Sequence, residues 1–207
     1  MKKFKIGIVG ATGYTGTELI RLLFDHPGVS IEWITSQNYV GKKISEVFPH
    51  LVGKCELVAE EYSIEKAVAL KLDLVFLALP HGLAHGIVPA LIEKNIKVVD
   101  LGADYRFKDT NVYEKYYVPH TSKELAAKAV YGMPELKQRD AILKAKLLAN
   151  PGCYVTASTL ALKPLTDKGL VKKGTIIIDA KSGVTGAGRK LALTSHFCES
   201  HGNFTAY

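Results

Sequence analysis

Residues 149–156, Ala-Asn-Pro-Gly-Cys-Tyr-Val-Thr, have side chains and spacing suited to covalent catalysis. Pro151 and Gly152 predict a tight turn after a short apolar strand, and Cys153 then opens a helix. The free N–H groups and the positive dipole end at a helix N-terminus favour an anion such as a thiolate. A thiolate is a nucleophile, and the neighbouring N–H groups can hold the oxyanion that forms on an attacked carbonyl. The pattern predicts Cys153 as a catalytic nucleophile, with a small buried cysteine in a turn as the alternative.

A second candidate site lies near the N-terminus, where three glycines separate a strand from a helix. The strand is predicted over residues 3–9, and Gly10, Gly13 and Gly16 precede a helical pattern that ends near Asp25. Glycines in this setting permit a tight turn and let a phosphate approach backbone N–H groups at the helix N-terminus. The spacing is G-x-x-G-x-x-G, not the commoner G-x-G-x-x-G, so a structural turn without a ligand is the alternative. The cofactor contacts assigned to this loop are Gly10, Thr12, Gly13, Tyr14, Thr15 and Gly16.

The end of the second predicted strand, residues 29–35, indicates which dinucleotide would bind. In dinucleotide-binding folds an Asp or Glu about 20 residues past the glycines binds the adenosine ribose 2′-hydroxyl. Ser36 stands in that place with Gln37 beside it, no acid is adjacent, and Lys42 and Lys43 follow. These residues favour contact with a 2′-phosphate and hence NADP(H) over NAD, although the two lysines also fit a solvated loop.

A later strand ends at residues that could face the same crevice. Residues 72–80 are a nearly continuous apolar run, typical of a strand buried in a parallel sheet. Ligands bind outside the carboxyl ends of such strands, so Pro80 and His81 are predicted to line the cofactor crevice. A histidine that only caps the helix expected over residues 83–94 is the alternative.

The strand expected over residues 97–101 leads to Asp104 and Arg106. These two side chains could form a structural ion pair with each other. The alternative is that Arg106 faces an anionic substrate. Residues 108–122 predict a surface excursion, and a short helix is expected to follow with Ser122 as its cap.

The order of elements predicts an α/β fold, with a doubly wound parallel sheet of Rossmann type carrying a dinucleotide over residues 1–149. A helix over residues 154–168 and a strand over residues 174–180 begin a second, incomplete α+β catalytic and dimerisation domain, residues 150–207. A second small-residue loop, residues 181–189, could let the backbone approach phosphate or the nicotinamide.

Composition narrows the possible functions. The chain has 207 residues, enough for one full domain and part of another, with 47% hydrophobic and 23% charged residues. No apolar run is long enough to span a bilayer, so we expect a cytoplasmic location without membrane association. The net charge of +7 comes with scattered lysines, a pattern that fits an anionic small-molecule partner better than nucleic acid. No C-x-x-C pair or H-E-x-x-H spacing occurs, so no metal site is expected.

Six motifs, in this order, resemble those of the N-acetyl-γ-glutamyl-phosphate reductases, an arginine-pathway family related to aspartate-semialdehyde dehydrogenases. They are residues 10–16 (GATGYTG), 79–82 (LPHG), 100–106 (DLGADYR), 131–135 (YGMPE), 150–154 (NPGCY) and 182–189 (SGVTGAGR). The resemblance extends over essentially the whole chain, and it implies Cys153 as the nucleophile and NADPH as the cofactor. It also implies that the second glycine loop completes the cofactor site, through Ser182, Gly183 and Gly186. The substrate contacts that we assign are Asn150, Arg106, Ser195, His196 and Glu199.

The reaction that the resemblance implies is NADPH-dependent reduction of N-acetyl-γ-glutamyl phosphate to N-acetylglutamate semialdehyde, with phosphate release and a thioester on Cys153. The family's acid/base histidine is expected beyond Tyr207, because His196 and His201 do not match its motif. Val155 also stands where the family usually has proline. In this family the chain continues well past the position that matches Tyr207. A homo-oligomer is expected of the full-length form.

Three alternatives stay open. A reductase of another acyl phosphate, either aspartyl phosphate or the carrier-linked substrate of the lysine pathway, would share nearly every motif. A cysteine hydrolase is disfavoured by the dinucleotide loop and by the lack of a recognisable Cys-His-Asn signature. A chain without its acid/base histidine could also bind NADP and catalyse little.

Overall fold

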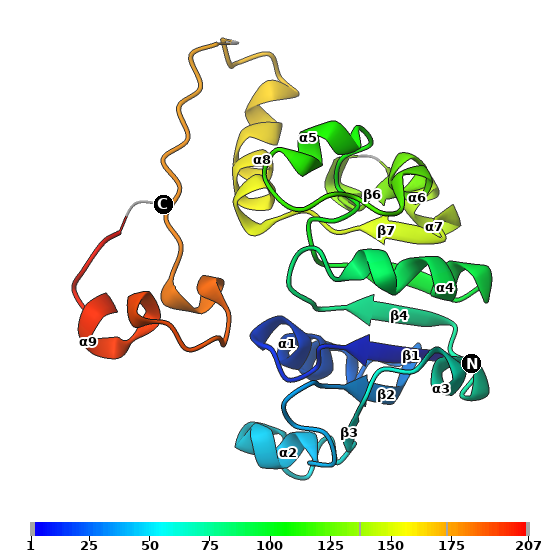
Figure 1. Cartoon of the computed structure of the whole chain (residues 1–207). Helices are drawn as coiled ribbons and strands as arrows, with labels where there is room; N and C mark the ends of the chain where they lie inside the picture. Colours follow the sequence, from blue (N-terminus) through cyan, green and yellow to red (C-terminus); the bar gives the residue numbers. More distant parts are fainter. Residues whose placement is uncertain (1–2, 137, 173, 206–207) are drawn as a thin grey trace.

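A parallel sheet of seven strands organises the computed structural model, which describes residues 3–136, 138–172 and 174–205. The strand order is β3-β2-β1-β4-β5-β7-β6, and every neighbouring pair runs parallel (Figure 1). The strands are β1 Phe4–Val9, β2 Val29–Thr35, β3 Ala59–Glu60, β4 Leu74–Leu77, β5 Lys97–Asp100, β6 Val130–Tyr131 and β7 Leu147–Ala149.

Helices connect the strands and pack on both faces of the sheet. Successive side chains of a strand point to opposite faces, so Ile8 of β1 packs in one core cluster with Ile20 of α1. Val9 packs in the other cluster, with Leu91 of α4. The helices are α1 Tyr14–Leu23, α2 Ile44–Val47, α3 Ile64–Ala69, α4 Val88–Glu93, α5 Thr110–Glu114, α6 Lys123–Lys128, α7 Arg139–Lys144, α8 Cys153–Thr166 and α9 Phe197–Ser200. Within the described residues, no helix is long and apolar enough to cross a membrane.

The strand order reverses between β1 and β4, which is where such sheets open a crevice for a ligand. The chain moves outward from β1 through β2 to β3, and then returns to place β4 on the other side of β1. Backbone hydrogen bonds of the sheet continue just past the strand ends. The N–H of Ala78 donates to the carbonyl of Val9, that of Leu101 to the carbonyl of Leu77, and that of Asn150 to the carbonyl of Asp100. The loops after β1, β4, β5 and β7 therefore share one edge of the sheet, on the left in Figure 1.

Five predicted strands are confirmed as β1, β2, β4, β5 and β7, and with them the doubly wound parallel sheet. β4 stops before Pro80 and His81, which therefore lie in the loop beyond the strand. The helix expected over residues 154–168 is α8, and it already begins at Cys153.

The strand predicted over residues 174–180 is wrong. No described strand pairs with this backbone, and a β-branched run becomes a strand only where a neighbour completes its ladder of hydrogen bonds. The segment instead runs along α8, and Ile177 is 91% exposed. The predicted domains also include residues 1–2, 137, 173 and 206–207, which lie outside the described residues.

The surface excursion expected over residues 108–122 is wrong in part. The segment contains α5 and buries two of its rings, Tyr113 and His120. The Tyr113 hydroxyl donates to the Asp104 carboxylate at 3.0 Å, and His120 Nε2 lies 2.7 Å from the Asp104 carbonyl oxygen. Both rings can be buried because their polar atoms find partners inside the protein.

Candidate active site

The predicted nucleophile, Cys153, is the first residue of the 14-residue helix α8, and it is exposed. Gly152 caps this helix end in extended backbone geometry, and its carbonyl accepts hydrogen bonds from the N–H and hydroxyl of Thr156. No acidic side chain stands in the first turn to oppose an anion there. The thiol is thus presented to solvent at the positive end of a helix, which argues against a small buried cysteine.

The turn before Cys153 is fastened to the neighbouring loop by Arg106. The guanidinium donates from Nε to the carbonyl of Asn150 at 2.8 Å and from Nη2 to the carbonyl of Leu101 at 2.9 Å. The Asn150 side-chain amide donates to the Pro151 carbonyl at 3.0 Å. Two of the five predicted substrate residues, Asn150 and Arg106, therefore lie at the nucleophile's turn, and both hold its backbone.

The suggested ion pair between Asp104 and Arg106 is not among the ion pairs of the described residues. The Asp104 carboxylate is buried and accepts from the N–H groups of Gly82 at 2.7 Å and Ala84 at 3.0 Å. It therefore fixes the loop after β4, while Arg106 fixes the turn after β7. The segment that follows β5 thus holds two neighbouring loops, the one after β4 through Asp104 and the one after β7 through Arg106.

Asp100, the last residue of β5, is a buried acid beneath this site. Its Oδ1 accepts from the N–H of Gly102 at 3.0 Å, whereas Oδ2 has no hydrogen-bond partner among the described residues. Burial raises the pKa of the Asp100 carboxyl to about 7, and the nearby charge of Asp104 adds to the rise. The Gly102 hydrogen bond and the charge of Arg106 act in the opposite direction.

The first glycine loop has the shape that a phosphate-binding turn needs. Gly10 has a φ of +83°, and a Cβ there would lie 2.3 Å from the carbonyl oxygen of Ala78. At Gly16 a Cβ would lie 2.4 Å from the Gly10 oxygen, so α1 packs directly against the loop. At Gly13 the nearest atom would be 3.5 Å away, which leaves room in front of the helix N-terminus. Tyr14 and Thr15 begin α1 and are exposed.

The residues beyond β2 provide hydroxyls and no carboxylate. Ser36 is buried, its Oγ lies 2.7 Å from Thr12 Oγ1, and it accepts from the N–H of Tyr39 at 3.2 Å. Gln37 is exposed beside it. The nearby Lys43 pairs with a carboxylate, that of Glu56, at 3.4 Å. Of the two lysines predicted to favour NADP, this one already has a counter-charge.

His81 lies in the loop after β4, with its ring orientation fixed. The N–H of Ala103 donates to His81 Nδ1 at 3.0 Å, so a neutral ring carries its proton on Nε2. The ring of Tyr117 meets it edge-on at 5.1 Å. Pro80 beside it is exposed. His81 does not cap α4, which begins at Val88.

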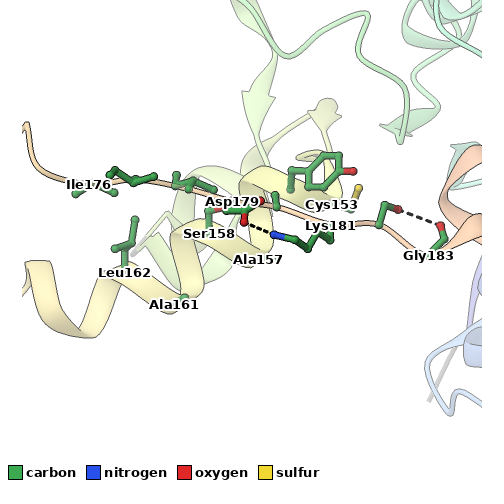
Figure 2. Close-up of a pocket in the computed structure, with 14 residues that line it drawn as sticks. Cys153, Ala157, Ser158, Ala161, Leu162, Ile176, Asp179, Lys181 and Gly183 are labelled. Atoms are coloured by element: carbon green, nitrogen blue, oxygen red, sulfur yellow. Dashed lines mark hydrogen bonds and ion pairs between the residues drawn. The ribbon is translucent and has the colours of Figure 1, made fainter. Parts of the chain in front are cut away.

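A groove of about 560 Å³ runs between α8 and the extended residues 176–183. Cys153, Ser182 and Gly183 all line this groove, and Figure 2 shows Cys153 and Gly183 toward the same end of it. Lys181 and Asp179 of the extended segment form an ion pair with each other, and both line the groove. The described structure therefore brings the second glycine loop next to the nucleophile, and Gly186 continues it in a short 3-10 helix.

The remaining predicted substrate residues lie elsewhere. Ser195, His196 and Glu199 do not line the groove, and Figure 1 shows α9 well away from α8. The side chains that sequence reasoning did not assign are Asp100 and Arg189, although both stand in motifs singled out above. Nothing in the spacing indicates that Arg189 reaches back to Thr12, whose carbonyl accepts from Nη1 at 3.1 Å.

Known proteins resemble this chain over nearly its full length. N-acetyl-γ-glutamyl-phosphate reductase of Desulforudis audaxviator is 52% identical over 204 residues, and the protein of the same name from Pelotomaculum thermopropionicum is 50% identical over 204 residues. Each match covers 98% of this chain and 58% of the relative. The chain thus spans a little over half the length of these relatives.

Solved structures share the fold at lower identity. Aspartate semialdehyde dehydrogenase with NADP, from Candida albicans, has a TM-score of 0.56 at 21% identity, over 82% of this chain and 48% of that one. Aspartate semialdehyde dehydrogenase II complexed with ASA, from Vibrio cholerae, has a TM-score of 0.56 at 19% identity, over 80% of this chain and 47% of that one.

Two family models match the chain in succession. Residues 5–145 match the NAD binding domain of semialdehyde dehydrogenase, and residues 153–207 match its dimerisation domain. The seven-stranded sheet is therefore the NAD-binding unit, and α8 begins a segment of the dimerisation domain. The first match alone covers more than half of this chain, and the chain therefore belongs to the semialdehyde dehydrogenase family.

Proposed function

We propose that this chain is the cofactor-binding and nucleophile-bearing part of a reductase that converts N-acetyl-γ-glutamyl phosphate to its semialdehyde with NADPH. The observation that carries the proposal is the exposed Cys153 at the N-terminus of α8, on the same sheet edge as the glycine loop. Relatives at 52% and 50% identity carry that enzyme's name, which supports this substrate over other acyl phosphates.

The proposed chemistry uses the Cys153 thiolate to capture the acyl group. Its sulfur attacks the acyl carbon, a C–S bond forms, the C–O bond to phosphate breaks, and phosphate leaves with that electron pair. N–H groups at the α8 N-terminus can hold the oxyanion of the tetrahedral adduct. NADPH, when bound, would supply the hydride that reduces the thioester carbonyl. Breaking the C–S bond in the reduced adduct releases the aldehyde and returns the thiolate.

The residues present fit NADPH. Open space at Gly13 and the close packing at Gly16 leave the N-terminus of α1 accessible to a pyrophosphate. The hydroxyls of Thr12 and Ser36 lie at the ribose end, and residues 36–43 contain no carboxylate that would repel a 2′-phosphate. We extend the cofactor site to His81 and to Ser182, Gly183 and Gly186 of the second loop. The solved structure of aspartate semialdehyde dehydrogenase from Candida albicans contains NADP, which supports NADP(H) as the cofactor.

For the substrate we propose contacts at Asn150 and Arg106, which lie at the turn before Cys153. Within the described residues no histidine lines the groove beside Cys153, so this proposal assigns no acid/base histidine. We propose a homo-oligomer for the whole protein, because residues 153–207 match a domain described by its dimerisation. The domain boundary is proposed between residues 149 and 150.

The test is NADPH oxidation by the purified protein that contains this sequence, with N-acetyl-γ-glutamyl phosphate, aspartyl phosphate and the carrier-linked lysine-pathway substrate compared. We expect one NADPH oxidised per phosphate released, and only with the first substrate. Preference for another acyl phosphate would overturn the assignment of N-acetyl-γ-glutamyl phosphate as the substrate. Phosphate release without NADPH oxidation would point to a hydrolase, and NADPH binding without any turnover would overturn the reductase proposal.

A further inference from the structure

Arg189 joins the second glycine loop to the first. Its Nη1 donates to the carbonyl of Thr12 at 3.1 Å, across 177 positions of sequence. The guanidinium also lies over two aromatic rings, 5.0 Å from the Tyr39 centroid and 4.7 Å from the Phe48 centroid. Arg189 is half-buried in this position. A guanidinium stacked on aromatic rings is attracted by their negative faces and loses rotational freedom there.

The charge of Arg189 is not neutralised by any ion pair within the described residues. Two acids that contact residues of this part of the fold, Glu56 at Ser45 and Glu60 at Ser36, are paired with lysines. Glu56 lies 3.4 Å from Lys43 Nζ. Glu60 lies 3.2 Å from Lys66 Nζ and accepts from Trp33 Nε1 at 3.3 Å. A fixed, partly desolvated cation without a carboxylate partner favours an anion from outside the chain.

The position of Arg189 indicates which anion that is. Thr12, to which it bonds, has its hydroxyl 2.7 Å from that of Ser36, at the end of β2. This is where a dinucleotide fold meets the adenosine ribose, and where an arginine accommodates the 2′-phosphate of NADP. The only hydrogen bond it makes within the described residues uses Nη1, and a guanidinium carries five N–H donors. Two hydroxyls and a guanidinium fork are the donors that a phosphate takes.

We propose that Arg189 recognises the 2′-phosphate and thereby selects NADP(H) over NAD(H). This inference rests on the proposed NADPH-dependent function. It transfers to Arg189 the role that the sequence had assigned to Lys42 and Lys43. It also gives the second glycine loop a dual role, because Ser182 lines the groove that contains Cys153 while Arg189 reaches the ribose end of the cofactor site.

The test compares the binding of paired ligands that differ in the 2′-phosphate, with no turnover required. Dissociation constants for NADPH and NADH, and for 2′,5′-ADP and 5′-AMP, are measured for the wild type, Arg189→Ala and Lys190→Ala. We expect Arg189→Ala to weaken both 2′-phosphate ligands by about 10- to 100-fold and leave NADH and 5′-AMP nearly unchanged. Lys190, the exposed next residue, is the matched control and should change neither pair.

Equal weakening of NADPH and NADH in Arg189→Ala, or no change in either, would overturn the inference while leaving the proposed function intact. A wild type that binds neither NADPH nor 2′,5′-ADP would overturn both. Ser36→Asp is the second variant, for the case that Arg189→Ala does not fold. Its carboxylate would repel the 2′-phosphate at the site that Arg189 faces, so binding of NADPH should weaken at least about tenfold more than binding of NADH. Equal effects on the two cofactors would again contradict the inference.

Discussion

Arg106 donates from Nε to the main-chain carbonyl of Asn150 at 2.8 Å, and so ties the loop after β5 to the turn that presents Cys153. The second bond, to Leu101, keeps the guanidinium on its own loop. The N–H of Asn150 in turn donates to Asp100 at 2.8 Å. The nucleophile's turn is therefore held from the neighbouring strand and not only by its own helix.

Replacing Arg106 with methionine should destabilise the protein. The substitution keeps much of the side-chain volume but leaves the carbonyls of Asn150 and Leu101 without their charged donor. We expect the free energy of unfolding to fall by about 2 kcal/mol, the usual scale for such bonds. Urea unfolding measures this loss, with Arg139→Met on the exposed surface of α7 as the control. Equal stability of the two variants would show that the Arg106 bonds do not hold the turn.

Two glycines of the first loop should respond differently to alanine. A Cβ at Gly16 would meet backbone at 2.4 Å, so Gly16→Ala should cost about 2 kcal/mol or more of stability. A Cβ at Gly13 meets nothing closer than 3.5 Å, and its φ of −79° suits alanine, so the fold should lose less than about 1 kcal/mol. Gly13→Ala should nevertheless weaken NADPH about tenfold or more, because the methyl group blocks the approach of the pyrophosphate.

Thermal melting and NADPH titration on the same two variants separate these effects. A Gly13→Ala protein that binds NADPH as tightly as the wild type would place the pyrophosphate elsewhere. A Gly16→Ala protein of wild-type stability would contradict the close packing of α1 on the loop.

The buried carboxyl of Asp100 should make stability depend on pH. Its pKa is raised from an ordinary 3.8 to about 7, chiefly by burial, so between these values the folded protein keeps a proton that the unfolded chain releases. The free energy of unfolding should therefore fall as the pH rises through this window, and the effect should level off above it. At 1.36 kcal/mol per unit, the fall between about pH 5 and about pH 8 is at most about 3 kcal/mol.

Asp100→Asn isolates this contribution, because the amide has the same shape and does not titrate. Urea unfolding at the two pH values should show the variant gaining stability relative to the wild type as the pH rises. A constant difference between the two proteins would mean that Asp100 does not titrate in this range. The charges that act on it, Asp104 and Arg106, are unchanged in both proteins.

Cys153→Ser should abolish reductase activity, by more than about 1,000-fold, because a serine hydroxyl is not ionised at the helix N-terminus. NADPH binding should stay nearly unchanged, since the glycine loop is untouched. Cys198→Ser is the matched control, because Cys198 is also exposed but lies in α9, away from the groove. Loss of activity in the Cys198 variant, or retention of activity in the Cys153 variant, would show that Cys153 is not the nucleophile.

Local patterns were sufficient for the elements that carry the site. The glycine spacing of the first loop and the Pro151-Gly152 turn are visible in short stretches of sequence, and the strands before them are mainly apolar. The sequence therefore predicted the carboxyl edge of the sheet and the start of α8 at Cys153. Hydrogen bonds across the fold required the structure. The Arg106 bond to Asn150 spans 44 positions and the Arg189 bond to Thr12 spans 177.

Misassigned elements have physical causes of the same kind. Residues 174–180 have the composition of a strand, but a strand also needs a neighbouring backbone, and the described residues place none beside it. Tyr113 and His120 belong to a polar, tyrosine-rich segment that indicates the surface. They are buried because Asp104 offers both of them hydrogen bonds. The short strands β3 and β6 have too few residues to show a period.

The acyl group itself can be sought on Cys153. The purified protein is mixed with N-acetyl-γ-glutamyl phosphate in the absence of NADPH, quenched in acid, digested and sequenced by tandem mass spectrometry, beside Cys153→Ser. We predict an N-acetylglutamyl thioester on Cys153, formed with an equal amount of released phosphate and absent from the variant. Phosphate release without an adduct, or an adduct on Cys198, would contradict the assignment of Cys153 as the nucleophile.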